Sequence, residues 1–145
     1  MLTRESSAEI TMPLEDVYSF VSNPMNEPKW HSDVLEVSPP TGGVAPGASM
    51  TWTLSFMGKR KMELQVQELV PNQREELQAQ QAMMGMKPTI TYLFERSGTG
   101  TKFTRRVDME LSGAWKIMTP MVGPMVQRKN AGFVQNLKAA LETAP

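Results

Sequence analysis

The chain has 145 residues, enough for one globular domain with a substantial apolar core. Its 15 Lys and Arg residues balance 15 Asp and Glu residues, which argues against nucleic-acid binding through bulk positive charge. Cysteine is absent, and this excludes disulfides, thiolate metal sites and a cysteine nucleophile. Methionine is unusually frequent, because 13 Met residues stand against 11 Leu residues. Thioether side chains are flexible, so the composition indicates an adaptable apolar interior.

The first ten residues contain Arg4, Glu5 and Glu9 and no continuous apolar run, so we expect no signal peptide. No window approaches the roughly 18 apolar residues of a membrane-spanning helix. The Pro/Gly-rich stretch 39–47 is a loop rather than a domain linker. The sequence therefore predicts a soluble cytoplasmic protein with one domain over residues 1–145.

The N-terminal part predicts one strand followed by two short helices. Residues 2–11 alternate loosely, as in a strand. Pro13 occupies a first helical position, and the apolar residues of 14–21 recur with helical spacing. Asn23-Pro24 ends this helix, and residues 25–31 form a second short one.

The middle of the chain has a period of two, which is typical of half-buried strands. Hairpin-length loops separate these segments, so we expect an antiparallel meander of about six strands. The alternating segments are 50–56, 62–67, 77–83, 90–94 and 103–111.

The C-terminal part predicts a long helix that covers the sheet. Apolar residues from Trp115 to Leu141 recur at helical steps and form a single stripe. Pro120, Gly123 and Pro124 interrupt the first half, where we expect a kink or a separate short segment. One apolar sheet face and one amphipathic helix predict an α+β domain.

The order of these elements, together with several local strings, resembles the SRPBCC superfamily. This superfamily includes START domains, the birch-pollen-allergen fold and polyketide cyclase/dehydrase-like proteins, and the resemblance covers nearly the whole chain. The strings that carry it are Pro13–Tyr18, Val21–Pro24, Trp30, Gly47, Leu69–Asn72, Tyr92–Glu95, Gly98–Thr101, Gly113, Asn136–Lys138 and Leu141–Glu142.

The resemblance implies a helix-grip fold. In this fold a curved antiparallel sheet, here of about six or seven strands, wraps around the C-terminal helix, and two short helices follow the first strand. A deep apolar cavity between sheet and helix would bind a lipid or another small molecule. The superfamily contains carriers, cyclases, dehydratases and toxin–antitoxin members, so the fold alone does not define a function.

Residues on the inward faces of the strands and on the first half of the last helix are the expected pocket wall. Plain core packing is the alternative explanation for the methionines, including Met50. Met84, Met86 and Met121 are expected near the cavity mouth. The expected ligand-binding residues are Trp30, Trp52, Leu54, Met62, Leu64, Met83, Tyr92, Phe94, Arg105, Val107, Met109, Trp115, Met118, Met121 and Met125.

Arg105 is the most informative candidate for chemistry. It alternates with Phe103 and Val107, so it shares their apolar face. A guanidinium there would anchor a ligand carboxylate or polarise a carbonyl. The alternatives are a bulge that places Arg105 outside, or an acid such as Glu68 that neutralises it.

Two further residues are candidates for proton transfer. Tyr92 would place a phenol in the cavity, as a hydrogen-bond donor or acid, or simply as packing. His31 is the single histidine, and it is either a lone general base at the pocket edge or, as we rather expect, a surface side chain. One His without Cys predicts no metal site, and no cofactor is expected.

Three functions are compatible with these features. The first is binding of a hydrophobic small molecule: a lipid, a polyketide or an aromatic compound. The second is a polyketide cyclase or dehydratase that uses Arg105, Tyr92 or His31 in the same cavity. The third is an interaction module that uses a sheet edge or the loop from Met83 to Met86. We expect a monomer or homodimer with no nucleic-acid partner and no stable membrane insertion.

Overall fold

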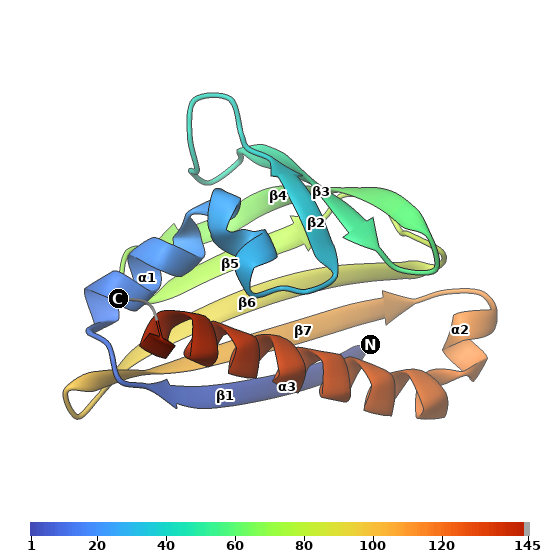
Figure 1. Ribbon diagram of the computed structural model, residues 1–145. Helices are drawn as coiled ribbons and strands as arrows, with labels where there is room; N and C mark the ends of the chain where they lie inside the picture. The colour runs from blue at the N-terminus through green and yellow to red at the C-terminus, as the bar shows by residue number, and fades with distance from the viewer. Residues whose placement is uncertain (144–145) are drawn as a thin grey trace.

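Seven strands form one antiparallel sheet in the computed structural model, which describes residues 1–143. The strand order is β1-β7-β6-β5-β4-β3-β2, and the sheet curves around the C-terminal helix (Figure 1). The expected helix-grip architecture is confirmed. In chain order the elements are β1 (Leu2–Ile10), α1 (Leu14–Ser22), η1 (Pro24–Lys29), β2 (Val34–Ser38), β3 (Ser49–Ser55), β4 (Lys59–Val70), β5 (Arg74–Ala79), β6 (Met86–Ser97), β7 (Gly100–Leu111), α2 (Ala114–Ile117) and α3 (Thr119–Thr143).

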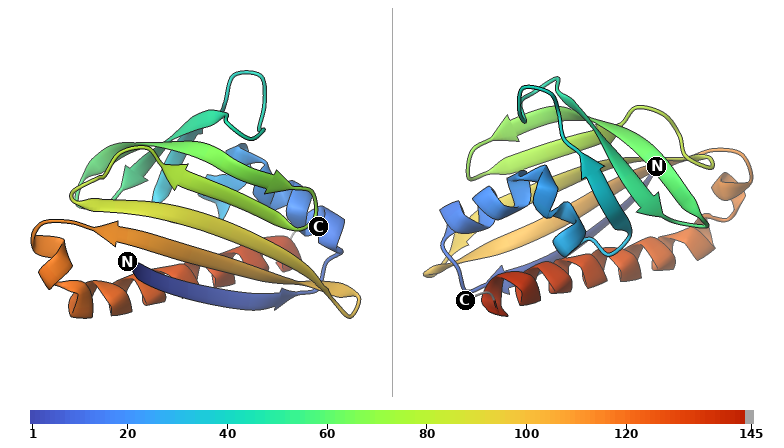
Figure 2. Two further views of the ribbon diagram at one scale, coloured as in Figure 1. Left: turned by 180° about the vertical axis from the view of Figure 1, so that it is seen from behind. Right: turned by 45° about the horizontal axis from the view of Figure 1, so that its top comes forward.

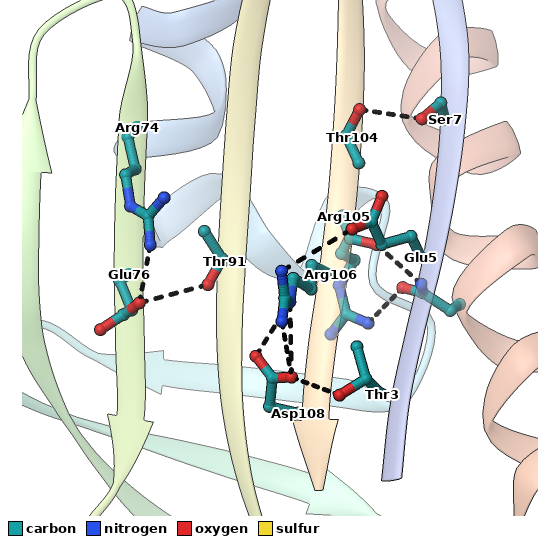
Figure 3. Close-up of polar contacts among 11 residues, drawn as sticks. Thr3, Glu5, Ser7, Arg74, Glu76, Thr91, Thr104, Arg105, Arg106 and Asp108 are labelled. Atoms are coloured by element: carbon teal, nitrogen blue, oxygen red, sulfur yellow. Dashed lines mark hydrogen bonds and ion pairs between the residues drawn. The ribbon is translucent and has the colours of Figure 1, made fainter.

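Alternation along the central strands separates an apolar concave face from a polar outer face. Tyr92 and Phe103 are fully buried on the concave side. On the outer side, Asp108 Oδ2 accepts a hydrogen bond from Arg106 Nε at 3.1 Å, and Thr3 Oγ1 donates to Asp108 Oδ1 at 2.6 Å (Figure 3). The period of two in the sequence therefore becomes a sheet with one face toward the helix and one toward water.

The long helix runs along the concave face beside β1 and β7, while α1 packs against β6 and η1 against β2 (Figure 2). The buried residues of α3, among them Val126, Phe133 and Leu137, follow helical spacing. A separate short segment, α2, precedes α3 as expected, but Pro120, Gly123 and Pro124 lie within α3 and do not divide it. Pro120 is tolerated because it lies in the first turn of α3, where a backbone N–H has no partner within the helix.

Three details differ from the sequence prediction. Strand β2 was not anticipated, because a bulge between Val34 and Glu36 breaks its period of two. The strand expected over 77–83 spans Arg74–Ala79, and the chain then turns through a bridge between Met83 and Met86. The second short helix is a 3-10 helix that ends at Lys29.

Two glycines give a matched test of packing. A Cβ at Gly100 would lie 2.4 Å from the carbonyl oxygen of Ile10, so Gly100→Ala must displace the pairing of β1 with β7. We expect Gly100→Ala to lower the free energy of unfolding by about 1–3 kcal/mol. Gly132 lies in the interior of α3 with no heavy atom within 4 Å of the added Cβ. Gly132→Ala should therefore raise the free energy of unfolding by about 0.5–1 kcal/mol, and urea titration of both variants measures the two changes.

Candidate functional site

A cavity of about 130 Å³ lies between the sheet and α3. Most of its wall is apolar, and five of the lining residues are methionines, which supply a flexible surface. Its polar residues are His31, Asp33, Arg105, Lys129 and Asn130. The apolar lining residues are Trp52, Leu54, Phe56, Met62, Met83, Met86, Pro88, Ile90, Val107, Met109, Met125, Val126 and Phe133.

The structure brings some of the predicted pocket residues together and leaves others elsewhere. Trp30, Leu64, Tyr92 and Phe94 are buried but belong to the core rather than the cavity wall. Those that line the cavity are Trp52, Leu54, Met62, Met83, Arg105, Val107, Met109 and Met125.

The predicted residues at the start of the C-terminal helical region lie away from the cavity. Trp115 packs against a small second cluster near Leu2 and Val122. Met118 is 37% exposed and Met121 is 69% exposed. These side chains project outward because α2 and the first turn of α3 extend past the end of the sheet.

Sequence reasoning missed several lining residues, of which Asn130 is the most informative. Asn130 is 1% exposed and lies four residues after Val126 and four before Val134, both buried. A polar residue within the apolar stripe of a helix is therefore the signal that would have found it. The other lining residues that were not anticipated are Asp33, Phe56, Pro88, Ile90, Val126, Lys129 and Phe133.

Arg105 lies on the concave face and is 4% exposed. Its Nη1 donates to Asn130 Oδ1 at 2.7 Å, and Asn130 Nδ2 donates to the Arg105 carbonyl oxygen at 2.8 Å. The alternative that a bulge places Arg105 outside is wrong, because β6 and β7 pair without a register shift. Glu68 does not neutralise it either, since Glu68 pairs with Arg74 at 3.1 Å.

Aromatic faces supply the rest of the surroundings of Arg105. Its Cζ lies 5.1 Å from the ring centre of Phe133 and 6.0 Å from that of Tyr92, within the range of cation–π attraction. Among residues 1–143, no carboxylate lies within ion-pair distance of this guanidinium. A buried cation without a contacting anion is costly, so Arg105 favours an additional acceptor.

His31 is buried, with 5% of its surface exposed, so the expected surface position is wrong. Its ring stacks on Phe133 with centroids 3.9 Å apart. Burial, with the nearby charge of Arg105, holds the pKa of His31 well below its ordinary value. Arg105 Nη2 lies 3.2 Å from Nε2 of the neutral ring, so Nε2 accepts and the proton resides on Nδ1.

A second polar contact lies in the core beside the cavity. Tyr92 Oη donates to Glu27 Oε2 at 2.6 Å, and both side chains are almost fully buried. Burial raises the pKa of Glu27 to about 7, against the opposing effects of Tyr92 and Arg105. Burial likewise raises the pKa of Tyr92 well above its ordinary value. Nothing in the sequence around Glu27 indicated its burial, because the short 3-10 helix has no clear period.

Glu75 extends this buried acidic region. It pairs with Tyr92 across β5 and β6 and is 2% exposed. Its pKa is raised to about 8 by burial first and by the charge of Glu27 second. Glu75 alternates with Leu77 and Ala79, so the sequence period could have identified it as inward-facing.

Three nitrogen atoms of cavity-lining residues lack a hydrogen-bond partner within the described chain. They are Arg105 Nε, His31 Nδ1 and Trp52 Nε1. Each carries a hydrogen in the state described above, and a buried N–H without an acceptor is destabilising. These three N–H groups therefore remain available to an acceptor that the described chain does not supply.

Over residues 1–143, the His, Asp and Glu side chains form no group of three or more that could hold a metal ion. In the same range no helix has an apolar stretch long enough to cross a bilayer.

A curved sheet, a long C-terminal helix and an apolar cavity between them define a START-like helix-grip protein. The sequence matches the family described as "Polyketide cyclase / dehydrase and lipid transport" over residues 1–142. The chain therefore belongs to the polyketide cyclase/dehydrase and lipid transport family, which confirms the resemblance noted in the sequence. No curated protein matches it by sequence.

Solved structures share the fold at low sequence identity. A START superfamily protein from Mycobacterium smegmatis has a TM-score of 0.81 and 15% identity, with 98% of each chain covered. A protein from Thermus thermophilus has a TM-score of 0.77 and 15% identity, with 97% of each covered. The di-domain ARO/CYC BexL from the BE-7585A biosynthetic pathway has a TM-score of 0.82 and 16% identity, covering 100% of this chain and 48% of that one.

Proposed function

We propose that this protein binds a small, largely apolar molecule that presents one oxygen acceptor to Arg105. The observation that supports this function best is the juxtaposition of a mostly apolar wall with unpartnered N–H groups on Arg105, His31 and Trp52. Burial of the ligand's apolar surface would supply affinity at about 25 cal/mol per Å². The N–H groups would orient the ligand, because a carbonyl or carboxylate oxygen satisfies donors that are otherwise unpaired.

The size of the cavity limits the ligand. An apolar cavity of roughly 150 Å³ in another protein accepts benzene. The volume of about 130 Å³ found here therefore fits a single ring with a small polar substituent. A long acyl chain or a fused polyketide would require Met83, Met86 and Met125 to move, which their flexible side chains allow.

The arrangement of acids and bases favours binding over catalysis. The lone pair of His31 Nε2 already accepts from Arg105, and Tyr92 Oη already donates to Glu27 outside the cavity wall. Asp33 supplies the lining carboxylate, but Lys129 Nζ lies 2.9 Å from its Oδ2. None of these groups offers an unengaged base to a ligand, as proton abstraction in a cyclase or dehydratase would require.

The proposal is tested by calorimetric titration of ligand-free protein with matched aromatic probes. We expect benzaldehyde and benzoate to bind more tightly than toluene, because only the first two carry an oxygen acceptor. Native mass spectrometry of the purified protein would identify any ligand carried through purification. Absence of binding by all three probes would overturn the single-ring proposal, and turnover of a bound polyketide would favour the enzymatic alternative.

Filling the cavity gives a structural test of the same site. Val107 lines the cavity from β7 and is 5% exposed. Val107→Phe should abolish binding of the single-ring probes, because the new ring occupies their space, while the protein stays folded by circular dichroism. Val107→Ala enlarges the cavity and should preserve probe binding, at a cost of about 1–3 kcal/mol in stability. Equal probe affinity in both variants would place the binding site elsewhere.

A further inference from the structure

The guanidinium of Arg105 is held in direction by two partners that carry no charge. Its Nη1 donates to the amide oxygen of Asn130 at 2.7 Å, and its Nη2 lies 3.2 Å from the accepting Nε2 of the neutral His31 ring. Arg105 is 4% exposed, so water contributes little to the solvation of its charge. These contacts orient the fork of donors but do not neutralise it.

The charged residues around the cavity do not supply a counterion within residues 1–143. Asp33 is the carboxylate of the cavity wall, and its Oδ2 pairs with Lys129 Nζ at 2.9 Å. Two cations and one anion therefore leave the wall with a net positive charge. Glu27 contacts Tyr92 outside the wall, and burial raises its pKa to about 7, so roughly half of it is protonated at neutral pH.

Asn130 makes a second contact, which fixes the direction of its amide group. Its Nδ2 donates to the carbonyl oxygen of Arg105 at 2.8 Å, so one side chain of α3 binds both the backbone and the side chain of Arg105. An oxygen in place of Nδ2 would repel that carbonyl, and the amide oxygen is therefore the atom that faces the guanidinium. Asn130, which is 1% exposed, thus positions Arg105 and adds no charge beside it.

The presence of an amide rather than a carboxylate at position 130 determines the charge of the site. Asn and Asp have nearly the same shape, but an aspartate here would form an ion pair with Arg105 inside the protein. The amide leaves the place of the counterion to a molecule from outside. Since folding already buries Arg105, its loss of hydration is a cost of folding rather than of binding. A site prepared in this way favours an anion over a neutral ligand of similar size.

We propose that the ligand is a monocarboxylate with a small apolar body, and that Asn130 sets this preference by positioning Arg105 without neutralising it. The inference rests on the proposed function, whose oxygen acceptor it narrows to a negatively charged one. Arg105 Nε has no hydrogen-bond partner in the described chain. A carboxylate would supply both the acceptor and the negative charge that this group lacks, whereas a neutral carbonyl would supply the acceptor alone.

Calorimetric titration with benzoate and benzaldehyde tests the charge preference, because both probes carry one ring and an oxygen acceptor. We expect benzoate to bind at least about tenfold more tightly, since hydrogen bonds between charged groups are the stronger ones. The preference should persist at high salt, because salt screens a buried pair less than a surface pair. Equal affinities, or a preference that high salt abolishes, would overturn this inference and leave the proposed function standing. Binding of neither probe would overturn the proposed function itself.

Asn130→Asp tests the role of Asn130 directly. The new carboxylate should pair with Arg105 and weaken benzoate binding at least about tenfold, while the affinity for benzaldehyde should change by less than about threefold. Binding of benzaldehyde also shows that the variant keeps a folded cavity. Asn136→Asp is the matched control, because Asn136 lies further along α3, donates to the Trp30 carbonyl oxygen at 3.2 Å and does not line the cavity. This control should bind both probes as wild type does.

Asn130→Ala keeps the inference testable if Asn130→Asp does not fold. It removes the contact that positions Arg105 and adds no charge, so benzoate should remain the tighter ligand but by a smaller factor than in wild type. The ratio of the two affinities is the decisive quantity, because general damage to the cavity lowers both affinities and leaves their ratio unchanged. A wild-type ratio in Asn130→Asp or in Asn130→Ala would show that Asn130 does not set the charge preference, and would overturn its assignment.

Discussion

Wild-type protein should lose stability as pH rises from 5 to 9, and Glu75→Gln should abolish much of this loss. The folded state raises the pKa of Glu75 from 4.5 to about 8, so between these values the folded protein holds a proton that the unfolded chain releases. The free energy of unfolding therefore falls with rising pH by up to about 1.4 kcal/mol per pH unit. Across the whole window the loss amounts to roughly 4 kcal/mol. Gln keeps the shape of the protonated acid and has no such titration.

Urea titrations at pH 5 and pH 9 measure this effect. We expect wild type and Glu75→Gln to have similar stabilities at pH 5, and the variant to be more stable by several kcal/mol at pH 9. Glu63→Gln is the control, since Glu63 is an exposed glutamate on the neighbouring strand β4. If wild type and Glu75→Gln lose equal stability between the two pH values, Glu75 does not hold a proton in the folded state.

The groups that face Glu75 come from three elements, and one of them, Glu27, also titrates between pH 5 and 9. Glu27 from η1 adds a second raised carboxyl, with a pKa of about 7. Tyr92 from β6 and Tyr18 from α1 both have raised pKa values, for which burial is the main cause and the charge of Glu75 a smaller one. Arg105 lies close enough to lower the pKa of Glu27 but forms no ion pair with it. Below about pH 7, therefore, Glu27 is largely protonated and supplies little negative charge to compensate Arg105.

The period of the sequence was sufficient to predict the strands, the covering helix and the most important side chain, while the helix-grip architecture was implied by the family resemblance. Strict alternation placed Arg105 with Phe103 and Val107, and the paired strands keep that register. The helical stripe from Trp115 to Leu141 likewise predicted which element covers the sheet. Periods of 2 and 3.6 are local properties of a backbone that presents one face to the core, so one sequence suffices to detect them.

The polar partners could not be predicted, because they depend on contacts between distant segments. Glu27 meets Tyr92 across 65 residues, and His31 meets Arg105 across 74. Neither pair has a local spacing that a sequence pattern could reveal. The cavity boundary depends on how far α3 extends past the sheet, which is why Met118 and Met121 were expected in the wall but lie outside it.

Arg105→Met should lower affinity for an oxygen-bearing ligand selectively. A hydrogen bond to a charged group contributes about 1.5–3 kcal/mol, so we expect benzaldehyde or benzoate to bind about 10–100-fold more weakly. Toluene makes no such bond, and its affinity should change by less than about threefold. Calorimetric titration of both proteins with both kinds of ligand forms a double-mutant cycle, in which general damage to the cavity affects the ligands equally and cancels.

Two further variants distinguish a ligand contact from a structural role. Arg106→Met is the matched control, because Arg106 follows in sequence but lies on the outer face, where it pairs with Asp108 at 3.1 Å. The affinity of Arg106→Met for toluene and for benzoate should equal that of wild type. Arg105→Lys keeps the charge but not the fixed fork of donors that reaches Asn130 and His31, so it should recover only part of the lost affinity for benzoate. Equal losses for toluene and benzoate in Arg105→Met would mean that Arg105 holds the cavity open rather than binding the ligand.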